Sequence, residues 1–173
     1  MLETFKTLIG NQFEATLCTL DTCVDMCPEN AWSLRIGRYP FNQVVFHALF
    51  FADYYLGIDP EALRPQPFHR EHAGIFDDYE QLEDRAPVGR YERAFIKEYL
   101  QHCRSKAARV ITAETADSLS ARAAFQRRDH SRAELHVYNI RHLQHHAAQL
   151  SLRLRIDADQ DVPWIGSGWQ SEP

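Results

Sequence analysis

Helical spacing of apolar residues in long stretches of the chain constrains the fold most strongly. In the first stretch these residues step by three or four positions, as an amphipathic helix requires, and the stretch ends near Pro28. Its members are Phe5, Ile9, Phe13, Leu17, Leu20 and Val24. A second stretch begins after Tyr39-Pro40, runs to about Leu56 and stops at Gly57. It is apolar nearly all round, which predicts a central, buried helix.

Two further stretches show the same period. The third predicted helix runs from about Gly89 to about Thr112. The fourth opens at Ser131, where Glu134 three residues later completes a capping-box signal, and it extends to about Ile156. No alternation typical of a β-strand reaches a useful length, so the sequence predicts an all-α fold.

The segments between these helices predict how they are connected. Residues 57–88 contain four prolines among irregular polar residues and predict a long connection, with one helical turn over 77–83. Residues 113–130 are ambiguous, with room for one short helix. We therefore expect a single domain over residues 1–173, a four-helix bundle with a long crossover connection between helices two and three.

Composition excludes several classes of function. The 173-residue chain has a formal net charge of −5, and its basic residues are scattered, which disfavours a nucleic-acid partner. No stretch approaches the roughly 18 uncharged apolar residues of a membrane span, and no signal peptide is visible. The four cysteines form no CxxC pair, which predicts small buried side chains in a reducing compartment. We expect a cytoplasmic protein without a membrane partner.

The chemically informative residues lie in the fourth predicted helix. His142 and His146 are four residues apart and therefore project from one helix face, on a stripe that also carries Leu135 and Tyr138. Two imidazoles placed in this way can bind one transition metal. Two buried histidines without a shared ligand would each need a hydrogen-bond partner, so this pair indicates a metal site. A His142/His145 pair is also geometrically possible, but we interpret His145 as a flanking or outer residue.

A third ligand must come from another helix. His47 is the strongest candidate because it lies in the middle of the apolar second helix, and His102 on the third helix is its rival. The other four histidines, namely His69, His72, His130 and His136, are expected to be solvated or to cap helices. Three histidines leave coordination positions open for water or a substrate thiolate. HExxH, paired ExxH, phosphate-loop and GxSxG motifs are absent.

These residues resemble a known family. The run from Arg141 to Leu150 is similar to the last helix of the DinB-like and YfiT-like metal-dependent enzymes. The second helix of the same family resembles His47 and the segment that follows it, Ala-Leu-Phe-Phe-Ala-Asp-Tyr-Tyr-Leu. The family often has Gly where Ala148 stands. The resemblance implies the crossover four-helix bundle, a nickel or zinc ion on His47, His142 and His146, and frequent homodimers. It implies no DNA-binding activity.

The resemblance leaves two functions open. Characterised family members transfer low-molecular-weight thiols or isomerise maleylpyruvate with a thiol cofactor, which implies a metal-dependent thiol S-transferase or hydrolase acting on a small molecule. In this hypothesis Phe50, Phe51 and Tyr54 line the entrance to the site. The alternative is a non-catalytic, metal-binding stress-response module whose ion is structural.

Overall fold

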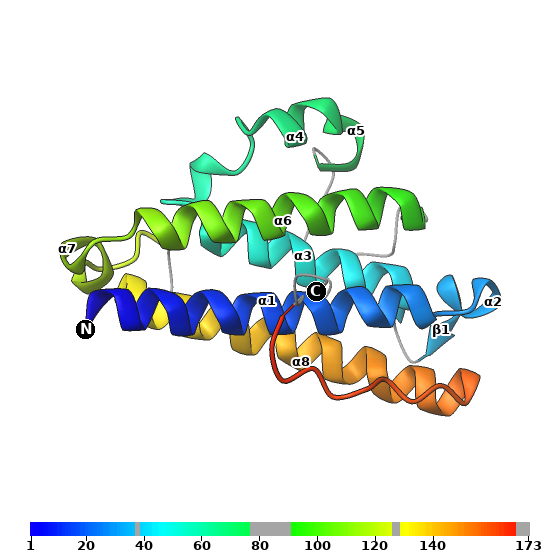
Figure 1. Cartoon of the computed structure of the whole chain (residues 1–173). Coiled ribbons are helices and arrows are strands. Elements are labelled where there is room, and N and C mark those ends of the chain that lie inside the picture. The colour runs from blue at the N-terminus through cyan, green and yellow to red at the C-terminus, as the bar shows by residue number, and fades with distance from the viewer. Residues whose placement is uncertain (37–38, 77–90, 126–128, 169–173) are drawn as a thin grey trace, which may run out of the picture.

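The computed structural model describes residues 1–36, 39–76, 91–125 and 129–168. Within these ranges long helices lie side by side along a common direction (Figure 1). They are α1 (Leu2–Met26), α3 (Phe41–Leu56), α6 (Arg93–Ala113) and α8 (Arg132–Ala158). Helices α1 and α3 each pack against both α6 and α8. The predicted all-α class is confirmed for the described residues, and none of their helices is long and apolar enough to cross a membrane.

Short elements join the long helices. They are α2 (Glu29–Trp32), the paired strands β1 (Arg35–Ile36) and β2 (Tyr39–Pro40), η1 (Pro60–Ala62), α4 (Pro67–Glu71), α5 (Ala73–Phe76) and α7 (Ala116–Ser120). The two strands pair in antiparallel register, with Arg35 opposite Pro40. The sequence predicted neither this pair of short strands nor the short helices of the 57–76 connection. The helical turn predicted over 77–83 lies outside the described residues.

The ends of the long helices follow local signals. Pro40 precedes the first residue of α3, and Gly57 is its C-cap. Ser131 and Glu134 form the predicted capping box at the start of α8, where the Ser131 Oγ accepts a hydrogen bond from the Glu134 N–H. Thr115 opens α7 in the same way. The short helix expected between 113 and 130 is therefore present.

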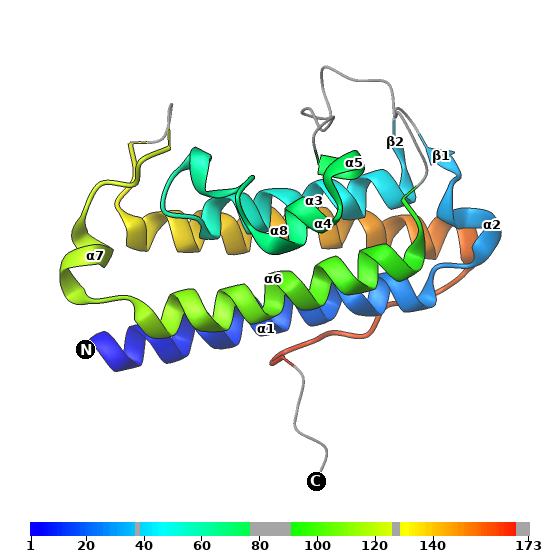
Figure 2. The ribbon, with the colours of Figure 1, turned by 90° about the horizontal axis from the view of Figure 1, so that it is seen from above.

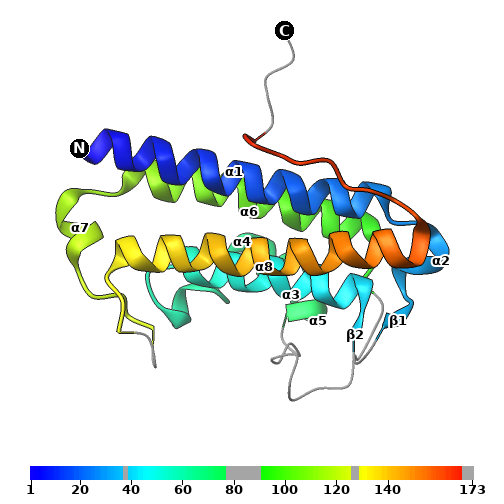
Figure 3. The same ribbon diagram turned by 90° about the horizontal axis from the view of Figure 1, so that it is seen from below.

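The core lies between the long helices, and α3 is buried on most of its surface. Its fully buried side chains include Phe46, Leu49 and Leu56. Of the cysteines, Cys23, Cys27 and Cys103 are buried, as predicted, whereas Cys18 is only half-buried. Viewed from below, α1 and α8 lie next to each other, and the segment after α8 folds back along α1 (Figure 3).

Two side chains of α8 fasten it to α3 and thereby set the position of the site. The Asn139 amide donates a hydrogen bond of 3.0 Å to the Ala52 carbonyl in the middle of α3. The Arg132 guanidinium donates to the Tyr55, Leu56 and Gly57 carbonyls at the end of α3. These last carbonyls have no partner within the helix, so Arg132 satisfies groups that would otherwise be unpaired.

Candidate metal centre

Three histidines of α3 and α8 converge in the structure. The ring centroid of His47 lies 5.3 Å from that of His142 and 4.7 Å from that of His146, and the two α8 rings are 4.6 Å apart. One ring nitrogen from each residue lies within 4.8 Å of the other two, which suits a single shared ion. The packing of α3 against α8 therefore brings together the three residues selected from the sequence.

Burial keeps the imidazoles of His47 and His146 neutral. Desolvation, with a contribution from the neighbouring histidines, lowers the pKa of His47 to about 3. Desolvation likewise lowers the pKa of His146 to about 4, although its hydrogen bond to Gln149 acts in the opposite direction. A neutral imidazole is the form that binds a metal, so at pH 7 both rings are in the ligating state.

The tautomer of His146 also fits a metal ligand. Its Nδ1 lies 2.9 Å from the Gln149 Oε1, a carbonyl oxygen that can only accept, so Nδ1 carries the proton. The Nε2 of the same ring is then an unprotonated acceptor that faces the His142 Nε2 at 3.2 Å. An outer partner that fixes the protonated nitrogen and leaves the other free is typical of metal-bound histidine. Gln149 thus orients one ligand, a role that the sequence did not predict.

The surroundings of the three histidines are aromatic on one side. The Phe51 ring lies 4.8 Å from His47 and 5.5 Å from His142, and it contacts Phe50 and Tyr54 in turn. His47 and His142 are half-buried, and His146 is 9% exposed. The site is thus walled by apolar rings but not sealed from solvent. His145 is exposed and accepts a hydrogen bond from the Gln149 amide, which agrees with a flanking position.

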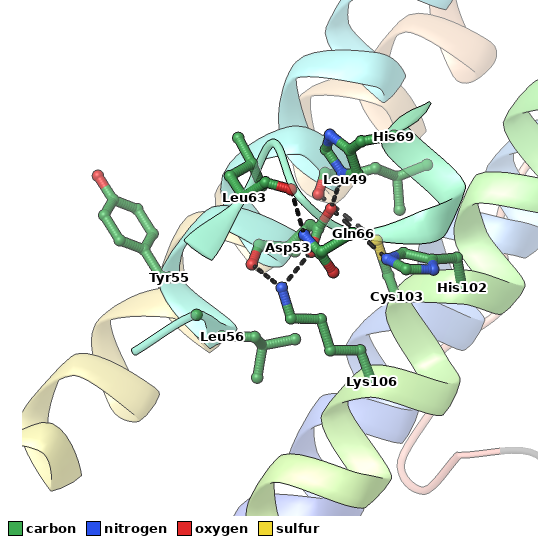
Figure 4. Close-up of polar contacts among 12 residues, drawn as sticks. Leu49, Asp53, Tyr55, Leu56, Leu63, Gln66, His69, His102, Cys103 and Lys106 are labelled. Carbon is green, nitrogen blue, oxygen red and sulfur yellow. Dashed lines mark hydrogen bonds and ion pairs between the residues drawn. The ribbon is translucent and has the colours of Figure 1, made fainter. Parts of the chain in front are cut away.

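The rival ligand His102 belongs to a different cluster (Figure 4). It approaches Asp53, on another face of α3, together with His69 from α4. Asp53 is fully buried and also accepts hydrogen bonds from Lys106, Gln66 and Tyr99. Although burial opposes ionisation of Asp53, the nearby imidazoles of His102 and His69 and the charge of Lys106 hold its pKa far below the usual range.

A third buried cluster surrounds Glu114, the C-cap of α6. The Arg132 Nε and the His136 Nε2 donate to one carboxylate oxygen at 2.8 and 2.9 Å, and the Ser118 hydroxyl donates to the other. Burial alone would raise the pKa of Glu114, but the hydrogen bonds from His136, Ser118 and Arg132 outweigh it and lower this pKa to about 2.

These clusters correct two predictions from the sequence. His69 and His136 were expected to be solvated or to cap helices, but they are 3% and 1% exposed and each contacts a buried carboxylate. Their burial depends on acids far away in the sequence, so helical spacing did not reveal it. A local signal did exist for Asp53, which is an acid within the most apolar stretch of the chain.

Comparison with known proteins supports the family assignment. The family model of the DinB superfamily matches residues 12–150, which include all three converging histidines. No curated protein and no solved structure matches the chain. Because the family model spans most of the sequence, from α1 to the middle of α8, the chain belongs to the DinB superfamily.

Proposed function

We propose that this protein is a metal-dependent enzyme that binds one divalent nickel or zinc ion through His47, His142 and His146. The observation that carries the proposal is the convergence of three imidazole nitrogens from α3 and α8 within 4.8 Å. Membership of the DinB superfamily supports it. We also infer the family architecture, a four-helix bundle of α1, α3, α6 and α8 with a crossover between α3 and α6, and a homodimer in the cytoplasm.

The chemistry follows from the small number of protein ligands. An ion held by three histidines retains open positions, where it would act as a Lewis acid and lower the pKa of a water or thiol that reaches it. The chain's own residues prepare this site. Gln149 fixes the His146 tautomer, and Phe51 shields one side of His47 and His142 from water. The half-burial of His47 and His142 leaves a route for a small substrate.

We infer that the reaction is the attack of an activated nucleophile, namely thiol S-transfer or hydrolysis, on a small-molecule substrate. The aromatic rings of Phe50, Phe51 and Tyr54 favour a substrate with an apolar part, because they offer no charged group. The same ion would be structural if solvent could not reach it. In the structure His142 is half-buried rather than sealed, and this observation favours the enzyme over a non-catalytic metal-binding module.

The first test is elemental analysis of the tag-free protein beside a His142→Ala/His146→Ala variant. A His145→Ala variant is the matched control, because His145 lies on the same helix turn but is exposed. We expect near-stoichiometric nickel or zinc in the parent and in the control. In the double variant, the metal bound at the three-histidine site should be lost. A parent that stays metal-free after incubation with zinc and nickel would refute the proposal.

The second test addresses catalysis. The metal-loaded protein is assayed for hydrolysis of p-nitrophenyl acetate and for transfer of glutathione to 1-chloro-2,4-dinitrobenzene. Activity in one assay that disappears in the double variant and persists in His145→Ala supports the enzyme. The structural module would be favoured by two results together. The protein would bind stoichiometric metal without activity in either assay, and small thiols would not change the absorption spectrum of the cobalt-substituted protein.

A further inference from the structure

Asp53 is the centre of a second group of metal-ligating side chains, contributed by α3, α4 and α6. The His69 Nε2 lies 2.5 Å from the Asp53 Oδ2, and the His102 Nε2 lies 3.6 Å from the same oxygen. One ligand atom from each of Asp53, His69 and His102 lies within 4.8 Å of the other two. Figure 4 shows both imidazoles directed toward the carboxylate. Helix α4 lies against α3 and α6 at this point, and Figure 2 shows the connection from above.

The hydrogen bonds around Oδ2 do not accommodate all the groups that approach it. A carboxylate oxygen offers about two lone-pair positions, and the Tyr99 hydroxyl donates to Oδ2 at 3.1 Å in addition to His69. The His102 Nε2 is buried and has no hydrogen-bond partner among the described residues. Leaving a buried ring nitrogen unpaired is unfavourable. This nitrogen is therefore directed at the cluster without a hydrogen bond that accounts for its position.

The other carboxylate oxygen is held separately. Oδ1 accepts hydrogen bonds from the Lys106 ammonium and from the Gln66 amide, and Lys106 also donates to the Asp53 carbonyl at 2.8 Å. Such outer partners orient a metal-binding carboxylate in known sites. They leave Oδ2 facing the two imidazoles. The positive charge of Lys106 repels a cation, so an ion here binds more weakly than at the three-histidine site.

We propose that Asp53, His69 and His102 form a second divalent-cation site, which ties the 57–76 connection to α3 and α6. Two histidines and one carboxylate suit a first-row transition metal such as Fe²⁺, Co²⁺ or Zn²⁺. When the His69 Nε2 binds a metal, the ring proton must lie on Nδ1. This Nδ1 makes no hydrogen bond to the described residues, so no acceptor role prevents it from carrying the proton. The ion reaches the cluster past His102, whose side chain is 17% exposed.

The site is tested by Co²⁺ titration of the His142→Ala/His146→Ala variant, with ligand-field absorption and equilibrium dialysis as readouts. This background removes the three-histidine site, so the outcome does not depend on the proposed function. We expect one equivalent of Co²⁺ to bind. Adding His102→Ala should weaken this binding by about tenfold or more, because a ligand is lost. Adding His72→Ala should leave it within about twofold, because His72, the C-cap of α4, lies outside the cluster.

Two outcomes would overturn the proposal. One is a folded double variant, verified by circular dichroism, that binds no Co²⁺. The other is bound Co²⁺ whose affinity is unchanged by His102→Ala. If the double variant does not fold, the same measurement is made on the otherwise unaltered chain. The proposal then requires His102→Ala to remove one equivalent from a total of two, whereas an unchanged stoichiometry contradicts it.

Discussion

The carboxylate of Glu114 gives the sharpest test of the energetics, because its pKa and its partners are both defined. Its pKa is about 2 in the folded protein, compared with an ordinary value of 4.5. A folded-state pKa below the unfolded one means that ionisation stabilises the fold at any pH above 4.5. The difference of roughly 2.5 pKa units corresponds to about 3 kcal/mol at pH 7. This contribution is lost as the pH falls from 4.5 toward 2.

The Glu114→Gln variant should therefore unfold more easily at neutral pH, with a free energy of unfolding about 3 kcal/mol below that of the parent. By the same linkage, the difference should shrink to roughly 1.5 kcal/mol at pH 3, because Glu114 is then almost fully protonated in the unfolded chain but still mostly ionised in the folded protein. Urea unfolding at pH 7, 4 and 3 measures both values. Other acid-sensitive groups are common to the two proteins and largely cancel in the comparison.

The matched control is Glu71→Gln, which removes an exposed carboxylate from α4 and should change stability by less than about 0.5 kcal/mol. The free energies of unfolding of the parent and of Glu114→Gln could differ by the same amount at pH 3 and pH 7. That result would show that the cluster acts through its shape and hydrogen bonds rather than through its charge. An undiminished stability of Glu114→Gln at pH 7 would refute the reasoning altogether.

Further predictions concern a helix cap, a buried ion pair and the metal. Ser131→Ala removes the acceptor of the α8 capping box and should cost about 1 kcal/mol in urea unfolding; an unchanged midpoint would contradict this role. Lys106→Met leaves the buried Asp53 carboxylate without its cation and should lower the free energy of unfolding by about 3–5 kcal/mol. A decrease below about 1 kcal/mol would show that the ion pair contributes little to stability. Free Zn²⁺ at about a hundred times its dissociation constant should raise the free energy of unfolding by about 2.7 kcal/mol, and a chelator should reverse this increase. Zinc binding without stabilisation would mean that the unfolded chain binds zinc equally well.

Much of the secondary structure could be predicted because its signals are local. The capping box at Ser131 and the stop at Gly57 fix helix ends within a few residues, and the apolar spacing fixes the buried face of each helix. The pairing of Arg35–Ile36 with Tyr39–Pro40 was missed because two-residue strands carry no usable period. The short helices of the 57–76 connection were missed because their prolines indicated irregular structure, although Pro is also suited to the first turn of a helix.

The sequence by itself determined the long helices and the pairing of His142 with His146, because positions four apart share a face in any α-helix. Tertiary packing decided the rest. It brought His47 to that pair through the contact of α3 with α8, and it took His102 to Asp53 on another face of α3. It also buried His69 and His136 against carboxylates that lie 16 and 22 residues away. The partner of a buried polar group is set by which helices meet, and that information is absent from the local pattern around the residue.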